Sequence, residues 1–285
     1  MLKCIVSDLD GTLLNDHHVL DALTIDCLTK CHERGIRFIV ATGRGHTGMG
    51  NVLDVLPFAL SSITCNGSEF YDEAGKRVFV VPIAKESLKQ ICACLDLDDY
   101  ALECYYDDGV YTALDPEIIY NFYAKAFSRR NGWSDEEAQK QVHAFLGNKV
   151  YRHAESVEAM LSHQIVKMEF TFIDPETRAY VQKKLESIDA IDVTSSNVDN
   201  LEIAHCDATK GKMLERICTY YGYEENEVVV FGDSENDVSM LASFPNSYAV
   251  HNASDQAKAA ASFLADDHAH QGVAKVILSL LENPI

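Results

Sequence analysis

The sequence predicts an α/β fold, a doubly wound parallel sheet that carries a separate α+β insert. Apolar segments alternate with helical patterns over residues 1–84 and again over 194–285, which is typical of parallel strands covered by helices on both faces. Residues 85–193 between them show a hairpin pattern, then helices and further strands, which is an α+β pattern. A length of 285 residues also fits about two domains. We therefore expect a core built from residues 1–84 and 194–285, with residues 85–193 inserted into it.

Each element of this assignment has its own signal. In the first part, apolar runs predict strands at 2–7, 36–41 and 61–65, separated by helices at 21–34, which Gly35 closes, and at 48–56 after a group of glycines. In the last part the same rhythm predicts a helix at 209–222, a strand at 227–232, a helix at 235–242, a strand at 247–250 and a helix at 271–282. In the insert we expect a helix at 85–95, a hairpin turning at Asp108-Gly109, a strand at 165–173, a helix opened by Pro175 and a strand near 190–195.

The composition indicates a soluble acidic protein of the cytoplasm. Asp and Glu outnumber Lys and Arg by 44 to 24, and the net charge of −20 repels phosphate backbones, so we expect no nucleic-acid partner. No run of about 18 apolar residues predicts a membrane span. The N-terminus enters a strand at once and leaves no room for a signal peptide. Nine cysteines in a long chain fit no disulfide framework, so we expect reduced thiols, in a monomer or weak homo-oligomer.

Polar side chains follow the predicted core strands at the point where each strand ends. Since ligands bind at the carboxyl ends of the strands in an open parallel sheet, we expect these groups to converge at one edge. They are Asp8 and Asp10 after the first strand, Thr42, Gly43 and Arg44 after the second, Asn66 after the third, and Asp233, Asn236 and Asp237 after strand 227–232, with Lys210 opening the helix before it. Helix capping explains single members such as Ser234 or Thr209, but not several carboxylates that meet a lysine.

This cluster predicts a divalent cation and phosphate chemistry. Two unit charges ~4 Å apart repel by about 4 kcal/mol at an effective dielectric constant near 20. Mg²⁺ offsets such repulsion and binds a few protein oxygens together with a substrate phosphate. A carboxylate beside the metal can attack phosphorus and form an aspartyl-phosphate, and a second carboxylate two residues away can act as general acid and base.

The same residues resemble a known family. DLDGTLL at 8–14, ATGR at 41–44, Lys210 and GDSENDVSML at 232–241 resemble the four motifs of the haloacid-dehalogenase-like (HAD) phosphohydrolases, which have a Rossmann-like core. The large insert, with CNGS at 65–68 and HNAS at 251–254, looks like the Cof-type branch, in which the insert is a type IIB cap that closes over the site. The stretch HCDAT before Lys210 is more polar than the family often shows.

The resemblance implies a role for each motif residue. Asp8 is the expected nucleophile and Asp10 the general acid and base. Mg²⁺ is expected on Asp8, the main-chain carbonyl of Asp10 and Asp233, with Asp237 beside these ligands. The residues expected to hold the phosphoryl group are Thr42, Gly43, Lys210 and Asn236, and those expected to line the entrance are Arg44, Asn66 and Asn252. The implied activity is a Mg²⁺-dependent phosphatase of small phosphorylated metabolites such as sugar phosphates.

Two other functions have weaker support. GRGHTG at 43–48 matches the glycine pattern of dinucleotide-binding turns, with Glu69 at the appropriate distance, and favours an NAD(P)-binding oxidoreductase. The match follows the second strand and leaves the carboxylates unexplained. Asp8-x-Asp10-Gly11 begins like a calcium-binding loop, but the ligands that such a loop needs farther on are missing. His268 and His270 could bind a metal, although we expect them to be solvated.

Overall fold

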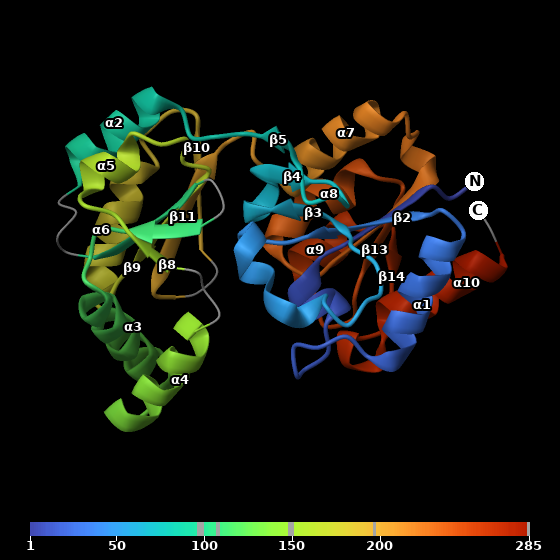
Figure 1. The fold of residues 1–285 in the computed structure, drawn as a ribbon, viewed down its shortest axis with the longest axis horizontal. Coiled ribbons are helices and arrows are strands. Elements are labelled where there is room, and N and C mark those ends of the chain that lie inside the picture. The colour runs from blue at the N-terminus through green and yellow to red at the C-terminus, as the bar shows by residue number, and fades with distance from the viewer. Residues whose placement is uncertain (96–99, 107–108, 148–150, 196–197, 284–285) are drawn as a thin grey trace. The chain divides into compact units, whose positions relative to one another are not determined.

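The computed structural model describes residues 1–95, 100–106, 109–147, 151–195 and 198–283, which form two compact units (Figure 1). The core unit consists of Met1–Arg44, Asn51–Val80 and Ala208–Ile285, and the insert unit of Gly45–Gly50 and Val81–Asp207. The chain thus leaves the core unit near the expected boundary at 84 but returns to it at 208, later than the expected 194.

The core unit contains a sheet in the order β14-β13-β12-β1-β2-β3-β4-β5. Its strands are β1 (Cys4–Ser7), β2 (Arg37–Ala41), β3 (Ser61–Thr64), β4 (Glu69–Tyr71), β5 (Arg77–Val80), β12 (Val228–Gly232), β13 (Asn246–Ala249) and β14 (Phe263–Leu264). Neighbours from β14 to β3 pair in parallel, and β4 and β5 extend the sheet as antiparallel strands. All four residues of β1 are fully buried, as expected for a central strand with both faces covered.

Helices cover this sheet on both faces. From β1 the chain passes through α1 (Ala22–Glu33) to β2, whereas from β12 it passes through α8 (Val238–Ser243) to β13 on the other side of β1. Because crossovers between parallel strands are right-handed, these opposite steps place α1 and α8 on opposite faces. The final helix α10 (Gly272–Glu282) packs against α1, and α7 (Lys210–Tyr221) packs against α8 (Figure 1). The short helix α9 (Asp255–Ala260) also contacts α8.

Local signals fix the ends of the helix that carries the predicted lysine. The Thr209 hydroxyl accepts a hydrogen bond from the backbone N–H of Lys212 at 3.2 Å and so caps the start of α7. Gly222, with φ +69°, ends the helix in the left-handed conformation that glycine adopts without strain. Lys210 is therefore the first residue of α7, and Thr209 acts as a cap.

The insert unit is built on a second sheet, in the order β10-β11-β9-β6-β7-β8. Its strands are β6 (Ala101–Tyr106), β7 (Gly109–Thr112), β8 (Tyr151–His153), β9 (Lys167–Thr171), β10 (Ile191–Thr194) and β11 (Asn200–His205). Its helices are α2 (Lys85–Cys94), α3 (Pro116–Asn131), α4 (Asp135–Gly147), α5 (Val157–Leu161) and α6 (Pro175–Leu185). The strands alternate, so that one face carries an apolar core and the other carries buried polar side chains, among them Glu103, Lys167 and Glu169.

The structure departs from the predicted elements in several places. Strand β11 pairs with β9 and β10 and belongs to the insert unit, although residues 194–285 were expected in the core. Strands β4, β5, β8, β11 and β14 and helix α9 were not predicted. The helix expected at 48–56 is absent, and a 3₁₀ segment occupies His46–Val52, because its glycines disfavour an α-helix. The hairpin from β6 to β7 forms, but its expected turn residue Asp108 lies outside the described residues.

Within the described part of the chain, no helix is both long and apolar enough to cross a bilayer.

Candidate active site

The registers of three core strands bring the first predicted motif residues together. In the sheet, Ser7 at the end of β1 lies opposite Phe231 of β12 on one side and Val40 of β2 on the other. The backbone N–H of Asp8 then donates to the carbonyl of Phe231 at 3.0 Å. The residues that follow each strand therefore emerge at one edge of the core sheet, as the sequence predicted.

A buried lysine lies between two carboxylates at this edge. Lys210 Nζ donates to Asp8 Oδ1 and to Asp237 Oδ1, both at 2.6 Å. Lys210 and Asp237 are fully buried, and Asp8 is only 5% exposed. The two carboxylates raise the pKa of Lys210 well above its ordinary value against the opposing effect of burial, so the lysine stays charged.

Asp233 is held by the two hydroxyls beside it. Its Oδ1 accepts from Thr12 Oγ1 at 2.8 Å, and its Oδ2 accepts from Ser234 Oγ at 2.9 Å. The second oxygen of Asp237 accepts from the backbone N–H groups of Asp233 and Ser234 at 2.9 and 3.0 Å. Asp237 therefore fixes both the lysine and the turn that carries Asp233, and these contacts favour a supporting position over direct metal ligation.

Three carboxylates at this edge fit a divalent cation. One oxygen each of Asp8, Asp233 and Asp237 lies within 4.8 Å of the others, and an all-oxygen set is what Mg²⁺ prefers. Burial raises the pKa of Asp8 well above its ordinary value, and the neighbouring carboxylates raise it further, although Lys210 opposes them. Burial and Asp237 also raise the pKa of Asp233. A bound cation would reverse these shifts, because it stabilises the ionised carboxylates.

Asp10 points to a different set of partners. Arg44 donates to both of its carboxylate oxygens, through Nε at 2.8 Å and Nη2 at 2.6 Å. The ring of His18, a residue with φ +55°, lies 3.3 Å from the same carboxylate. Arg44 was expected at the entrance of the site, and the structure shows that its guanidinium is hydrogen-bonded to Asp10, the expected general acid and base.

The remaining phosphate-binding candidates lie on neighbouring turns. Thr42 is buried, and its hydroxyl accepts from the backbone N–H of Arg44 at 3.2 Å. Asn236 Nδ2 donates to Asn66 Oδ1 at 2.9 Å, which joins the turn after β3 to the one after β12. A Cβ added to Gly43 would lie 2.8 Å from that same oxygen of Asn66, so these turns meet with no room for a side chain.

Asn252 lies at the edge of the cluster and anchors the loop that follows β1. Its Nδ2 donates to the carbonyl of Gly11 at 2.8 Å, and its Oδ1 accepts from the backbone N–H of His268. The ring of His268 in turn bonds to Asp16 at 2.9 Å. The side chain of His268 is only 18% exposed, so the expectation that it is solvated was wrong.

The sequence analysis assigned no role to Gly11 or Thr12, and only helix capping to Ser234. Gly11 has φ +78°, and an added Cβ would lie 2.7 Å from Asp233 Oδ2. Thr12 and Ser234 hold that same carboxylate. Gly11 and Thr12 belong to the motif DLDGTLL, so the sequence offered a signal for them. Their contacts with Asp233 join residues at least 221 positions apart and are therefore known only from the structure.

The structure does not support the alternative prediction that GRGHTG at 43–48 forms a dinucleotide-binding turn. A dinucleotide-binding turn opens an α-helix whose N-terminus faces the pyrophosphate. Here the GRGHTG stretch continues into the 3₁₀ segment His46–Val52.

Comparisons with known proteins find relatives over nearly the whole chain. The family model for haloacid dehalogenase-like hydrolases matches residues 5–277. The chain is 28% identical over 284 residues to the 5-amino-6-(5-phospho-D-ribitylamino)uracil phosphatase of Bacillus subtilis, covering 98% of each protein. It is also 28% identical over 280 residues to the pyridoxal phosphate phosphatase of Escherichia coli, again covering 98% of each.

Solved structures show the same fold. A haloacid dehalogenase-like hydrolase from B. subtilis aligns with a TM-score of 0.81 at 24% identity, covering 98% of this chain and 100% of that one. A subclass IIB sugar phosphatase of the superfamily aligns with a TM-score of 0.76 at 21% identity, covering 98% of each chain. The predicted fold class, the resemblance to Cof-type proteins and the prediction of a phosphatase are confirmed. Its motif residues meet at one sheet edge and the family model spans nearly all of its length, so the chain belongs to the haloacid dehalogenase-like hydrolases.

Proposed function

We propose that this chain is a Mg²⁺-dependent phosphatase of small phosphorylated metabolites and that Asp8 forms an aspartyl-phosphate. The observation that carries the proposal is the buried Lys210, bonded at 2.6 Å to both Asp8 and Asp237 beside a third carboxylate, Asp233. A lysine alone would suffice to neutralise one carboxylate. Three carboxylates around it leave a negative site that suits a divalent cation and the phosphate that the cation brings.

Asp8 is the proposed nucleophile because of its position. It directly follows the central strand, it is buried, and Lys210 holds its Oδ1, so that the carboxylate has one fixed orientation. Fixing the attacking group removes much of the entropy cost of reaching the transition state. The charged lysine also stabilises negative charge on the phosphoryl oxygens as the bond to the leaving group breaks.

Asp8, Asp233 and the main-chain carbonyl of Asp10 are the proposed ligands of Mg²⁺. When bound, the ion neutralises phosphoryl oxygens and orients the phosphorus toward the attacking carboxylate. Thr12 and Ser234 keep Asp233 turned toward this position, and Asp237 holds the backbone of the same turn.

Asp10 is the proposed general acid and base. Both oxygens of its carboxylate accept hydrogen bonds from Arg44, so this guanidinium occupies Asp10 before a substrate binds. A substrate phosphate is an anion and competes for the same guanidinium. We therefore propose that substrate binding draws Arg44 away from Asp10, which then exchanges its proton with the leaving oxygen and later with the attacking water.

The proposed substrates are phosphate monoesters of small metabolites. The relatives at 28% identity are named for a phosphorylated ribitylaminouracil and for pyridoxal phosphate, and these two compounds share a phosphate ester on a small polar molecule. The residues that hold the phosphoryl group recognise only this shared part. We propose that the insert unit acts as the cap of the family and supplies the side chains that choose among such compounds.

The test separates Asp8 from Asp10 with nitrophenyl phosphate, whose leaving group barely needs protonation. The proteins are Asp8→Asn, Asp10→Asn and the unchanged chain, quenched rapidly in acid and weighed intact by mass spectrometry. Loss of general acid and base help slows hydrolysis of the intermediate by about 10²–10⁴-fold. The Asp10 variant should therefore accumulate one phosphoryl group, located on Asp8 by borohydride reduction, and the Asp8 variant should carry none.

Three results would overturn parts of this mechanism. A label on Asp10 would reverse the two roles. Absence of any label, with multiple turnovers in the unchanged chain, would favour direct attack by water. Full activity in excess EDTA would exclude the proposed metal.

A further inference from the structure

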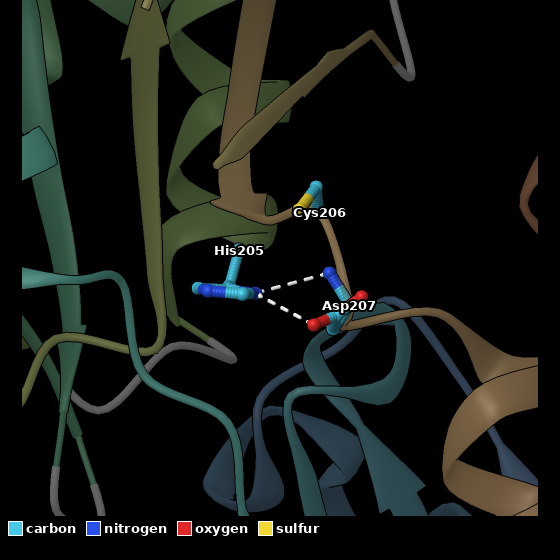
Figure 2. Close-up of side chains that lie close together, drawn as sticks. All are labelled: His205, Cys206 and Asp207. Atoms are coloured by element: carbon cyan, nitrogen blue, oxygen red, sulfur yellow. Dashed lines mark hydrogen bonds and ion pairs between the residues drawn. The ribbon is translucent and has the colours of Figure 1, made fainter. Parts of the chain in front are cut away.

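We propose that His205, Cys206 and Asp207 form a second metal site, for a cation such as Zn²⁺, outside the carboxylate cluster of the active site. One ligand atom of each residue lies within 4.8 Å of the other two. Figure 2 shows the three side chains gathered at the turn that follows β11. This is the polar stretch HCDAT before Lys210, which none of the roles proposed above explains.

The donor atoms determine which metal fits. The turn offers an imidazole nitrogen, a thiol sulfur and a carboxylate oxygen, and Zn²⁺ accepts all three types in tetrahedral sites. Mg²⁺ prefers oxygen ligands alone and suits the cluster of Asp8 and Asp233 instead. The two clusters therefore differ in their chemistry, and the turn selects a softer cation. Three protein ligands leave the fourth position to water.

The backbone around the turn holds the ligands in place. His205 is the last residue of β11, where it pairs with Ile191 of β10. The backbone N–H of Cys206 donates to the carbonyl of Ala190 at 3.1 Å. The N–H of Asp207 donates to His205 Nδ1 at 3.0 Å, and a carboxylate oxygen of Asp207 lies 3.9 Å from the same nitrogen (Figure 2). The ring is thus already turned toward the carboxylate, and a metal at Nδ1 would take the place of the N–H of Asp207.

Solvent can reach these groups. The side chains of His205 and Asp207 are 21% and 48% exposed. Cys206 is exposed, whereas the other cysteines that the structure describes are buried or half-buried. When the cation binds, the thiol of Cys206 loses its proton to the solvent and the resulting thiolate forms the bond to the metal. The cation keeps its charge, and no oxidant or reductant is needed.

The experiment titrates the whole protein with Co²⁺ as a coloured substitute for Zn²⁺, in excess Mg²⁺ so that the carboxylate cluster is saturated. We expect the near-ultraviolet absorption of a thiolate bound to cobalt, saturating at one Co²⁺ per chain and removed by one Zn²⁺. Cys206→Ser should abolish this absorption. In His205→Asn the amide oxygen still accepts the N–H of Asp207, yet Co²⁺ affinity should fall by more than the about 10–100-fold that loss of an outer-shell partner costs.

Cys92→Ser is the matched control, because it removes a half-buried thiol of α2 and should leave the absorption unchanged. The proposal is wrong if the unchanged chain shows no saturable absorption, or if the absorption survives in Cys206→Ser. It is also wrong if Co²⁺ binds only when Mg²⁺ is left out, because the cation then occupies the carboxylate cluster. The absorption reports on the thiolate and not on phosphate release, so its result is independent of the proposed phosphatase mechanism.

Discussion

Replacing Lys210 by methionine should destabilise the metal-free protein more than most single substitutions. Methionine has nearly the same length and stays buried, but it leaves Asp8 and Asp237 without their shared cation. Breaking a buried ion pair by removing one partner costs about 3–5 kcal/mol, because the remaining charge is unpaired. Repulsion alone gives a similar figure, since two charges no more than 4.8 Å apart repel by at least about 3.5 kcal/mol at an effective dielectric constant of 20.

The assay is thermal unfolding followed by circular dichroism, with and without Mg²⁺. In EDTA, a loss of about 3–5 kcal/mol lowers Tm by roughly 6–20 °C, at about 2–4 °C per kcal/mol for a protein of this size. Adding Mg²⁺ should recover part of this loss, so the ion should raise Tm more in Lys210→Met than in the unchanged chain. Lowering the pH should also narrow the difference, because protonated carboxyls no longer repel one another.

Lys212→Met on the same helix is the control, because Lys212 is exposed. An exposed charge contributes about 0–1 kcal/mol, so this variant should unfold within a few degrees of the unchanged chain. A decrease in Tm of less than about 2 °C for Lys210→Met in EDTA would refute the electrostatic reasoning. An equal effect of Mg²⁺ on both variants would refute the placement of the metal beside the lysine.

Three further predictions address the metal, the protons and the two units. Gly11→Ala should weaken Mg²⁺ binding measured by calorimetry, because the added Cβ would lie 2.7 Å from a carboxylate oxygen of Asp233. The control Gly35→Ala also has positive φ but no atom within 4 Å of the added Cβ, so it should lower stability without changing Mg²⁺ binding. Equal Mg²⁺ affinities in the two variants would contradict this prediction. Burial raises the pKa of Asp8 in the folded metal-free chain. Between pH about 4, where the unfolded chain loses this proton, and the raised pKa, the folded chain binds more protons than the unfolded chain. Its stability should therefore fall as the pH rises through this range. Mg²⁺ binding should correspondingly release protons, as calorimetry in buffers of different ionisation enthalpy would detect, and less in Asp8→Asn; no release in either protein would refute the shift. Replacing residues 81–207 by a short linker should leave a core that unfolds cooperatively and binds Mg²⁺, and an unfolded product would show that the core unit is not independent.

The strand ends were predictable because one physical signal specified them. A buried and mostly apolar run that stops at a carboxylate, as strand β1 stops at Asp8, places that carboxylate at the sheet edge whatever the rest of the chain does. The same reasoning applies to β12 and Asp233. Convergence then follows from the parallel order of the strands, which the alternation of strands and helices already indicates.

The pairing of side chains within the site was not predictable. The local sequence places an arginine directly after a strand. It does not indicate whether the side chain of Arg44 faces a substrate or bonds to Asp10, as it does in the structure. The contact of His268 with Asp16 joins residues 252 positions apart. Such polar contacts depend on where loops from distant segments meet, and loop positions carry no periodicity in sequence.

The boundary of the insert failed for a related reason. The pattern of β11 is a strand pattern that suits either sheet, because Leu201 and Ile203 alternate with polar residues as in any half-buried strand. Its partners, β9 and β10, are chosen by register and not by composition. No strand was predicted at Asn200–His205, and the alternating pattern would not have shown to which of the two sheets such a strand belongs.

Lys210 also explains how the core can fold before it meets a metal. Asp8, Asp233 and Asp237 are all at least partly buried, and three ionised carboxylates without a cation would oppose the docking of β12 beside β1. The lysine enters from the first turn of α7 and satisfies two of them with hydrogen bonds of 2.6 Å. Neither of these two bonds reaches Asp233. The neutral hydroxyls of Thr12 and Ser234 stabilise its carboxylate instead, and they hold its orientation without removing its charge. The fold thus supplies one fixed positive charge, and the negative charge that remains is what a divalent cation would neutralise.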